Sequence, residues 1–142
     1  MKAKDYLLQI RDIKKRILQI RQQLRQLDLD MSGLKSPDLG ADRVVSSSSG
    51  DKMLRLIIKH EAEYRRLMNE QDRLITVRSR ICQEIESLED GRHREILTYR
   101  YVLLMRWPEI AEAMSISESH MYRLHGDALE AFHKKMRVNE SK

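Results

Sequence analysis

The chain has 142 residues, of which 35% are charged and only 5% aromatic, and its formal net charge is +5. So short a chain forms one or two small domains and leaves little room for a catalytic cleft. The high share of charged residues is typical of long exposed helices rather than of a thick core. The basic excess favours a polyanionic partner.

The first 27 residues predict a long amphipathic helix. They hold eight Lys or Arg against two Asp, a local charge of +6. A lone helix of this length is not stable in water, so its apolar stripe must meet a partner. The stripe advances in alternating steps of four and three, as in a heptad seam, through Tyr6, Ile10, Ile13, Ile17, Ile20, Leu24 and Leu27.

Residues 28–50 break this pattern. Gly33, Pro37, Gly40 and the serine run 46–49 predict a flexible linker at about 28–50. A connection of this length is unusual inside a compact domain, so we expect part of it to be disordered.

A second helical stripe runs from Asp51 to Asp90, where Asp90-Gly91 is expected to end the helix. Gln71 and Arg78 interrupt the stripe, and polar residues on a seam often set its register. The simplest geometry folds the two helices back on each other, and a dimer through either stripe is the alternative. We expect residues 1–90 to be a coiled-coil or oligomerisation region. The second stripe comprises Met53, Ile57, Tyr64, Leu67, Leu74, Ile81, Ile85 and Leu88.

Residues 91–138 predict a three-helix module that contains a helix-turn-helix. A lead-in helix over 92–104 precedes the segment 107–124, WPEIAEAMSISESHMYRL. Ile110 and Ala111 would line one short helix, Ile116 would fill the turn, and Met121 and Leu124 would line the inner side of the second helix. The predicted fold class is therefore all-α, a long N-terminal helical hairpin or coiled coil followed by this module.

Local residue types support the turn. Pro108 lies at the start of the first helix, where a missing N–H costs nothing. Ser117 is expected to cap the second helix by accepting a hydrogen bond from the N–H of Ser119 or His120. Ser115 falls at the turn position where a left-handed residue is expected, at a cost of about 1–2 kcal/mol for a residue other than glycine.

The outer face of the second helix is the predicted DNA-reading surface. Arg123 is suited to a bidentate pair with guanine. The remaining side chains are expected to reach base edges or phosphates, with Arg106 and Trp107 directed at the phosphate backbone. The DNA-binding set is Arg106, Trp107, Ser117, Glu118, Ser119, His120, Tyr122 and Arg123.

The segment RYVLLMRWPEIAEAMSISESHMYRLHGDALEAF resembles a phage and prophage family of unknown function from Gram-positive bacteria. The opening MKAKDYLLQI and the lead-in DGRHREILTYRY are also similar to that family. The same C-terminal segment resembles region four of bacterial sigma factors and the ArpU-type phage transcriptional regulators, through Arg100-Tyr101, Glu109-Ile110-Ala111 and Ser117 onward. The resemblance implies DNA binding and control of phage genes.

We therefore expect a DNA-binding transcriptional regulator in the cytoplasm of a bacterial host, with double-stranded DNA as its partner. A homodimer or higher homo-oligomer would join two weak half-site contacts. One alternative is an adaptor that binds RNA polymerase, since residues 91–142 carry nine basic and seven acidic residues, a charge of only +2. The other is a DNA-packaging subunit of the small-terminase type.

The sequence argues against an enzyme, a metal site and a cofactor. Its five histidines have no Cys or carboxylate at ligand spacing. Cys82 lies inside an apolar helical stripe, as a buried small residue does. One cysteine permits no internal disulfide and suits a reducing compartment. The longest apolar run, residues 101–105, is far too short to span a bilayer, and we expect neither a signal peptide nor membrane contact.

Overall fold

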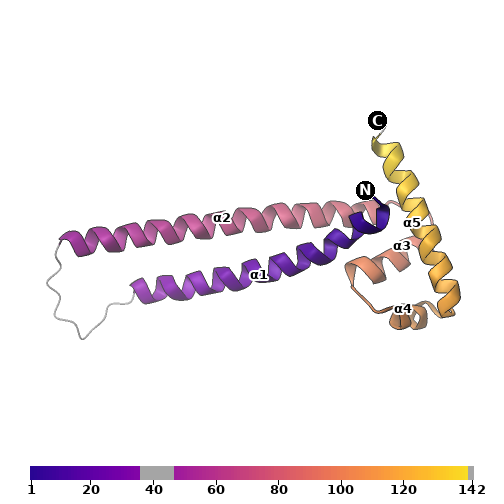
Figure 1. Cartoon of the computed structure of the whole chain (residues 1–142), viewed down its shortest axis with the longest axis horizontal. Coiled ribbons are helices and arrows are strands. Elements are labelled where there is room, and N and C mark those ends of the chain that lie inside the picture. Colours follow the sequence, from indigo (N-terminus) through magenta and orange to yellow (C-terminus); the bar gives the residue numbers. More distant parts are fainter. Residues whose placement is uncertain (36–46, 141–142) are drawn as a thin grey trace. The chain divides into compact units, whose positions relative to one another are not determined.

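The structure is a computed structural model that describes residues 1–35 and 47–140 (Figure 1). The described residues contain helices and no strand, which confirms the predicted all-α class. The elements in chain order are α1 (Ala3–Lys35), α2 (Ser47–Glu86), α3 (Gly91–Leu97), the π-helical turn η1 (Thr98–Val102), α4 (Trp107–Met114) and α5 (Glu118–Glu140).

The predicted linker at 28–50 was wrong at both ends. Helix α1 continues to Lys35 and α2 already begins at Ser47, so only residues 36–46, with Pro37 and Gly40, lie outside the described residues. Within this extension of α1, the half-buried Met31 lines a groove together with Tyr64 of α2. One glycine inside a helix costs only about 1 kcal/mol, so Gly33 does not by itself end α1.

The predicted end of α2 at Asp90-Gly91 was also wrong. Helix α2 ends at Glu86, and the hydroxyl of Ser87 donates to the carbonyl of Glu84 at 2.6 Å. Asp90 is instead the N-cap of α3, and its carboxylate accepts a hydrogen bond from the N–H of Arg92 at 2.8 Å. An aspartate before a helical residue is a strong start signal, and Gly91 has no positive φ.

The chain forms two compact units. One consists of residues 1–15 and 75–142, and the other of residues 16–74. The expected boundary at residue 90 falls inside the first unit.

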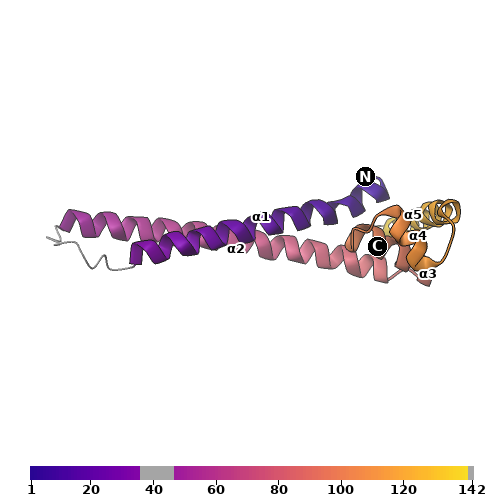
Figure 2. The same ribbon diagram turned by 90° about the horizontal axis from the view of Figure 1, so that it is seen from below.

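In the unit of residues 16–74, α1 and α2 lie antiparallel, side by side in both views (Figure 1, Figure 2). Ile20, Leu24 and Leu67 form its buried cluster. Arg16 donates two hydrogen bonds to Glu70, at 2.8 and 3.0 Å. The structure thus pairs the two stripes within one chain, as the simplest geometry predicted. Tyr64, expected on the buried stripe, is 38% exposed because it lines the groove beside α1.

In the other unit, the two ends of the hairpin and the C-terminal helices share one core. Ile10, Ile81, Ile85 and Leu88 are buried as predicted. Leu7, which lies off the predicted stripe, is fully buried in the same cluster. The C-terminal helices contribute Ile96, Leu97, Tyr101, Ile110, Ala111, Met121, Leu124, Ala128 and Phe132 to it.

Candidate nucleic-acid interface

Helix α4 begins and ends as the sequence predicts. Arg106 is its N-cap, and Pro108 lies in its first turn. Beyond Met114, Ser115 takes the left-handed conformation with φ 56° and ψ 45°. The N–H of Ile116 donates to the carbonyl of Ala111 and that of Ser115 to the carbonyl of Glu112, both at 3.1 Å. These two bonds form a Schellman motif, which turns the chain sharply toward α5.

The start of α5 is fixed by a cap. The Oγ of Ser117 accepts a hydrogen bond from the N–H of His120 at 3.1 Å, which confirms the predicted capping role. The carbonyl of Ser117 accepts the first helical bond from the N–H of Met121 at 2.9 Å. These bonds satisfy backbone groups that a helix terminus would otherwise leave open.

The predicted inner face of the motif is confirmed. Ile110, Ala111, Met121 and Leu124 are buried, and the half-buried Ile116 packs against them at the turn. Because Met121 and Leu124 take the inner side of α5, its opposite side carries the polar residues.

That opposite side is open to solvent. Glu118, Ser119, Tyr122 and Arg123 are exposed, Tyr122 at 51%. His120 is half-buried. Four predicted contact residues therefore form one accessible surface over the first two turns of α5, and we call these four the α5 outer face.

Trp107 has a different environment from the one the sequence suggests. The Arg100 guanidinium lies over its ring, 4.2 Å from the ring centroid. Its ring is also 5.4 Å from that of Tyr122 and 4.7 Å, edge to face, from that of His125. Cation–π and aromatic contacts of this kind add to the energy of burial. Trp107 thus buttresses Tyr122 on the outer face.

Arg100 and His125 are site residues that the sequence reasoning missed. The guanidinium of Arg100 also donates to the carbonyl of Met105 at 3.0 Å. His125 is 8% exposed, and its Nε2 is joined to the hydroxyl of the buried Tyr101 by a 2.7 Å hydrogen bond. The sequence pointed to this region only through the Arg100-Tyr101 pair, which precedes the helix-turn-helix and carries part of the family resemblance.

Burial shifts the pKa of both partners in that hydrogen bond. It raises the pKa of Tyr101 to about 12. Burial, helped by the positive charges of Lys4 and Arg100, lowers the pKa of His125 to about 4. A neutral imidazole therefore lies behind the outer face at neutral pH, so His125 adds no charge to it.

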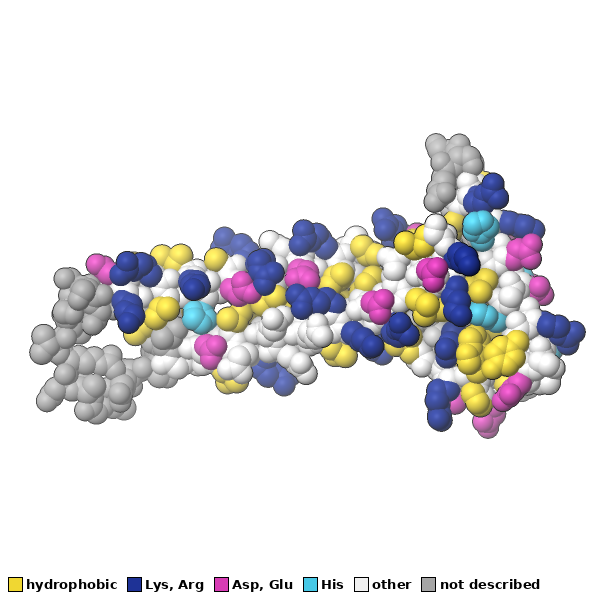
Figure 3. Space-filling model, viewed as in Figure 1, with side chains coloured by type: hydrophobic (Ala, Val, Ile, Leu, Met, Phe, Trp, Pro, Cys, Tyr) yellow, Lys and Arg dark blue, Asp and Glu magenta, His cyan; other side chains and the backbone are white. Residues whose placement is uncertain are grey.

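Arg106 is an exposed cation at the start of the motif. Its Nε donates to Glu109 at 2.6 Å, and its side chain is 84% exposed. The bond to Glu109 raises the pKa of the guanidinium. On the face drawn in Figure 3, Lys and Arg are spread over the surface with Asp and Glu among them.

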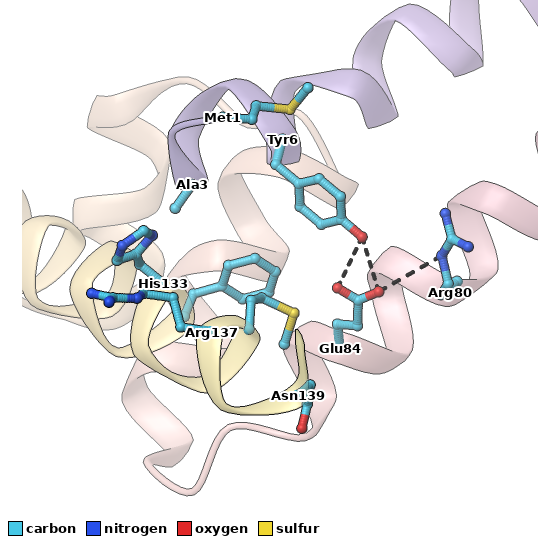
Figure 4. Close-up of a pocket in the computed structure, with 10 residues that line it drawn as sticks. Met1, Ala3, Tyr6, Arg80, Glu84, His133, Arg137 and Asn139 are labelled. Carbon is cyan, nitrogen blue, oxygen red and sulfur yellow. Dashed lines mark hydrogen bonds and ion pairs between the residues drawn. The ribbon is translucent and has the colours of Figure 1, made fainter. Parts of the chain in front are cut away.

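A cavity of about 810 Å³ is a second candidate site in the same unit (Figure 4). The hydroxyl of Tyr6 donates to both carboxylate oxygens of Glu84 at 2.9 Å, and Arg80 lies 3.8 Å from that carboxylate. Burial and Glu84 together raise the pKa of Tyr6. The ring of Phe132 lies 5.9 Å from that of Tyr6. Because Glu84 is already held by two partners, this arrangement suits binding rather than acid–base chemistry.

The described residues include no group of three or more His, Cys, Asp or Glu that could hold a metal ion. Cys82 is half-buried, and burial raises the pKa of its thiol, which lowers the fraction present as the reactive thiolate at neutral pH. None of the described helices combines the length and apolar content needed to cross a bilayer.

The fold and the site define an all-helical protein that presents a helix-turn-helix on a packed platform. Comparisons of the chain with protein-family models, with curated proteins and with solved structures find no match.

Proposed function

We propose that the protein is a DNA-binding transcriptional regulator of the phage type and that the first turns of α5 enter the major groove of double-stranded DNA. The observation that carries this proposal is the α5 outer face, whose four polar side chains are exposed on a helix fixed by a cap and a buried core. An exposed helix held in this way fits the width of the major groove.

Three side chains of the α5 outer face, together with Arg106 and Trp107, have a proposed role. Arg123 pairs with the O6 and N7 acceptors of a guanine, and Ser119 and Tyr122 contact base edges or phosphates. Arg106, exposed at the start of α4, contacts the phosphate backbone. Trp107 acts through Tyr122, because their rings are in contact. The target, from the resemblance to phage regulators, is phage DNA in a bacterial cytoplasm.

Selection of bound duplexes from a random library, followed by anisotropy titrations of the full chain, tests this proposal. We expect Arg123→Ala to lower the affinity for the selected site by about 5- to 150-fold, the effect of losing one bidentate base contact. The variant should also relax the preference at one base pair. Arg21→Ala is the matched control, since Arg21 is an exposed arginine of α1. It removes the same charge and should leave base preference unchanged. Absence of any sequence-preferring complex at about 10 µM protein contradicts the proposal.

An adaptor that binds RNA polymerase is the second candidate. Glu118 on the outer face and the charge of only +2 over residues 91–142 favour a protein partner over a polyanion. Retention of core polymerase by the full chain, unaffected by excess duplex DNA, would support this candidate. A ring-sized assembly in solution would instead support a DNA-packaging subunit.

A further inference from the structure

One side of α2 carries a regular row of exposed residues. Leu54 is 55% exposed and Ile58 is 57% exposed. Ile58 lies nine residues before the buried Leu67, which is two and a half helical turns, so the two residues are on opposite sides of α2. Leu54 and Ile58 are therefore turned away from the contact with α1. Glu61 and Arg65 also line the groove beside α1 and belong to the same row. We call it the α2 outer row, and it consists of Asp51, Leu54, Arg55, Ile58, Glu61, Ala62 and Arg65, all exposed.

The order of charged and apolar residues in the α2 outer row is complementary to the same order read backwards. From Asp51 to Arg65 the row consists of an acidic residue, Leu, a basic residue, Ile, an acidic residue, Ala and a basic residue. Two copies laid antiparallel about a two-fold axis at Ile58 bring Asp51 opposite Arg65 of the partner subunit and Arg55 opposite Glu61 of the partner subunit. Both ion pairs then occur twice, once on each side of the axis, as an isologous interface requires.

The apolar residues fit the same register. Leu54 meets the small Ala62 of the partner subunit, and Ile58 meets its own copy on the axis. A parallel pairing in register would place each charged residue opposite its own copy, and like charges across an interface repel. Glu63 and Arg66, on a neighbouring side of α2, are already paired with each other at 2.5 Å. Charge order thus favours a second copy in antiparallel orientation.

We propose that α2 from Asp51 to Arg65 is a homodimer interface, in which two copies pack antiparallel about Ile58. The contact is about 21 Å long, for 14 residues at 1.5 Å each. A short interface of this kind dissociates readily, so monomer and dimer exchange with protein concentration.

Sedimentation equilibrium of the full chain tests the interface. We expect a dimer at about 100 µM and dissociation on dilution. Ile58→Glu should raise the dissociation constant at least tenfold. Leu18→Glu is the matched control, since Leu18 is 51% exposed on α1 of the same unit, and it should leave the dissociation constant unchanged. A monomer at every concentration, or a mass larger than a dimer, overturns the proposal.

A charge exchange tests the pairing independently of apolar loss. R55E and E61R each place like charges opposite one another and should each weaken the dimer about tenfold or more. The double variant R55E/E61R restores opposite charges and should return the dissociation constant to within about threefold of the wild-type value. A double variant no tighter than the single ones overturns the proposed register.

Cysteine cross-linking tests the orientation, in a Cys82→Ser background. Ile58→Cys places two thiols on the two-fold axis and should give a disulfide-linked dimer on mild oxidation. Leu54→Cys places its two copies eight residues apart along the interface, about 12 Å, which a disulfide does not span. Equal cross-linking of both variants would indicate a parallel pair and contradict the antiparallel geometry.

Discussion

At the scale of single residues, Ser115 and His125 are in conformations or environments that residues of their type rarely occupy. Ser115 has a positive φ of 56°, and His125 is 8% exposed although it can ionise. Left-handed residues other than glycine and buried histidines both have an energetic cost. Both costs can be measured, because one substitution removes each.

Ser115→Gly should raise the free energy of unfolding by about 0.5–1 kcal/mol. Glycine relieves the left-handed strain, and its greater freedom in the unfolded chain cancels part of that gain. Urea unfolding followed by the fluorescence of Trp107, the single tryptophan, measures the change. Ser79→Gly is the control, an exposed serine inside α2 where glycine should lower stability by about 0.5–1 kcal/mol. Loss of stability in both variants would contradict the strain at Ser115.

His125 should make stability depend on pH between 6.5 and 4. Its pKa is about 4 in the folded chain, against 6.5 for an unperturbed histidine, so the unfolded state binds more protons in this window. The contribution is complete above pH 6.5 and is lost as the pH falls, by about 3 kcal/mol at and below pH 4.

Urea unfolding at several pH values compares the wild type with His125→Gln, which has no titrating ring. The variant should lack this part of the slope, while both chains keep the part due to carboxylates. Identical slopes from pH 6.5 to 4 would show that His125 ionises without cost in the fold.

At the scale of elements, the helix-turn-helix depends on its caps. The side chain of Ser117 caps α5, whereas Ser119, two residues later, is an exposed residue of the same turn. The two serines therefore separate the effect of a cap from that of a serine in the first turn.

Ser117→Ala should lower the free energy of unfolding by about 1 kcal/mol, because the N–H of His120 loses its acceptor. Ser119→Ala should change it by less than about 0.5 kcal/mol. Circular dichroism during urea unfolding measures both. Equal effects of the two substitutions would mean that the bond from His120 to Ser117 adds nothing to stability.

The sequence predicts features that depend on one helix better than contacts between helices. Helical period identifies the inner side of a helix, and so the buried Ile110, Ala111, Met121 and Leu124 were predicted. Period does not specify which residues meet across the core. The contact of Arg100 with Trp107 and the bond of Tyr101 to His125 join different elements, and only the folded packing brings them together.

Helix ends were the weaker part of the prediction. Asp90-Gly91 was interpreted as a stop because glycine often follows a helix, yet the aspartate caps the next helix. Gly33 was interpreted as part of a break, although α1 continues through it to Lys35. In both cases the same residue type is compatible with the end of a helix and with another structure. The residue type alone therefore does not fix where the helix ends.

At the scale of the whole molecule, the helix-turn-helix is not built from the C-terminal residues alone. Its unit joins residues 1–15 to residues 75–142, and one buried cluster contains residues of both stretches. We therefore expect a fragment of residues 91–142 to lack most of its fold. It omits Leu7, Ile10, Ile81 and Ile85, all of which are at most 1% exposed.

Leu7→Ala tests this dependence in the full chain. Leu7 is 0% exposed, so truncation leaves a cavity and should lower the free energy of unfolding by about 2–5 kcal/mol. Leu29→Ala, on α1 in the other unit, removes a side chain that is 61% exposed and should change it by less than about 0.5 kcal/mol. Because Trp107 lies in the unit of Leu7, its fluorescence reports unfolding of the helix-turn-helix itself. An unchanged Trp107 transition in Leu7→Ala would mean that the C-terminal helices fold without the start of α1.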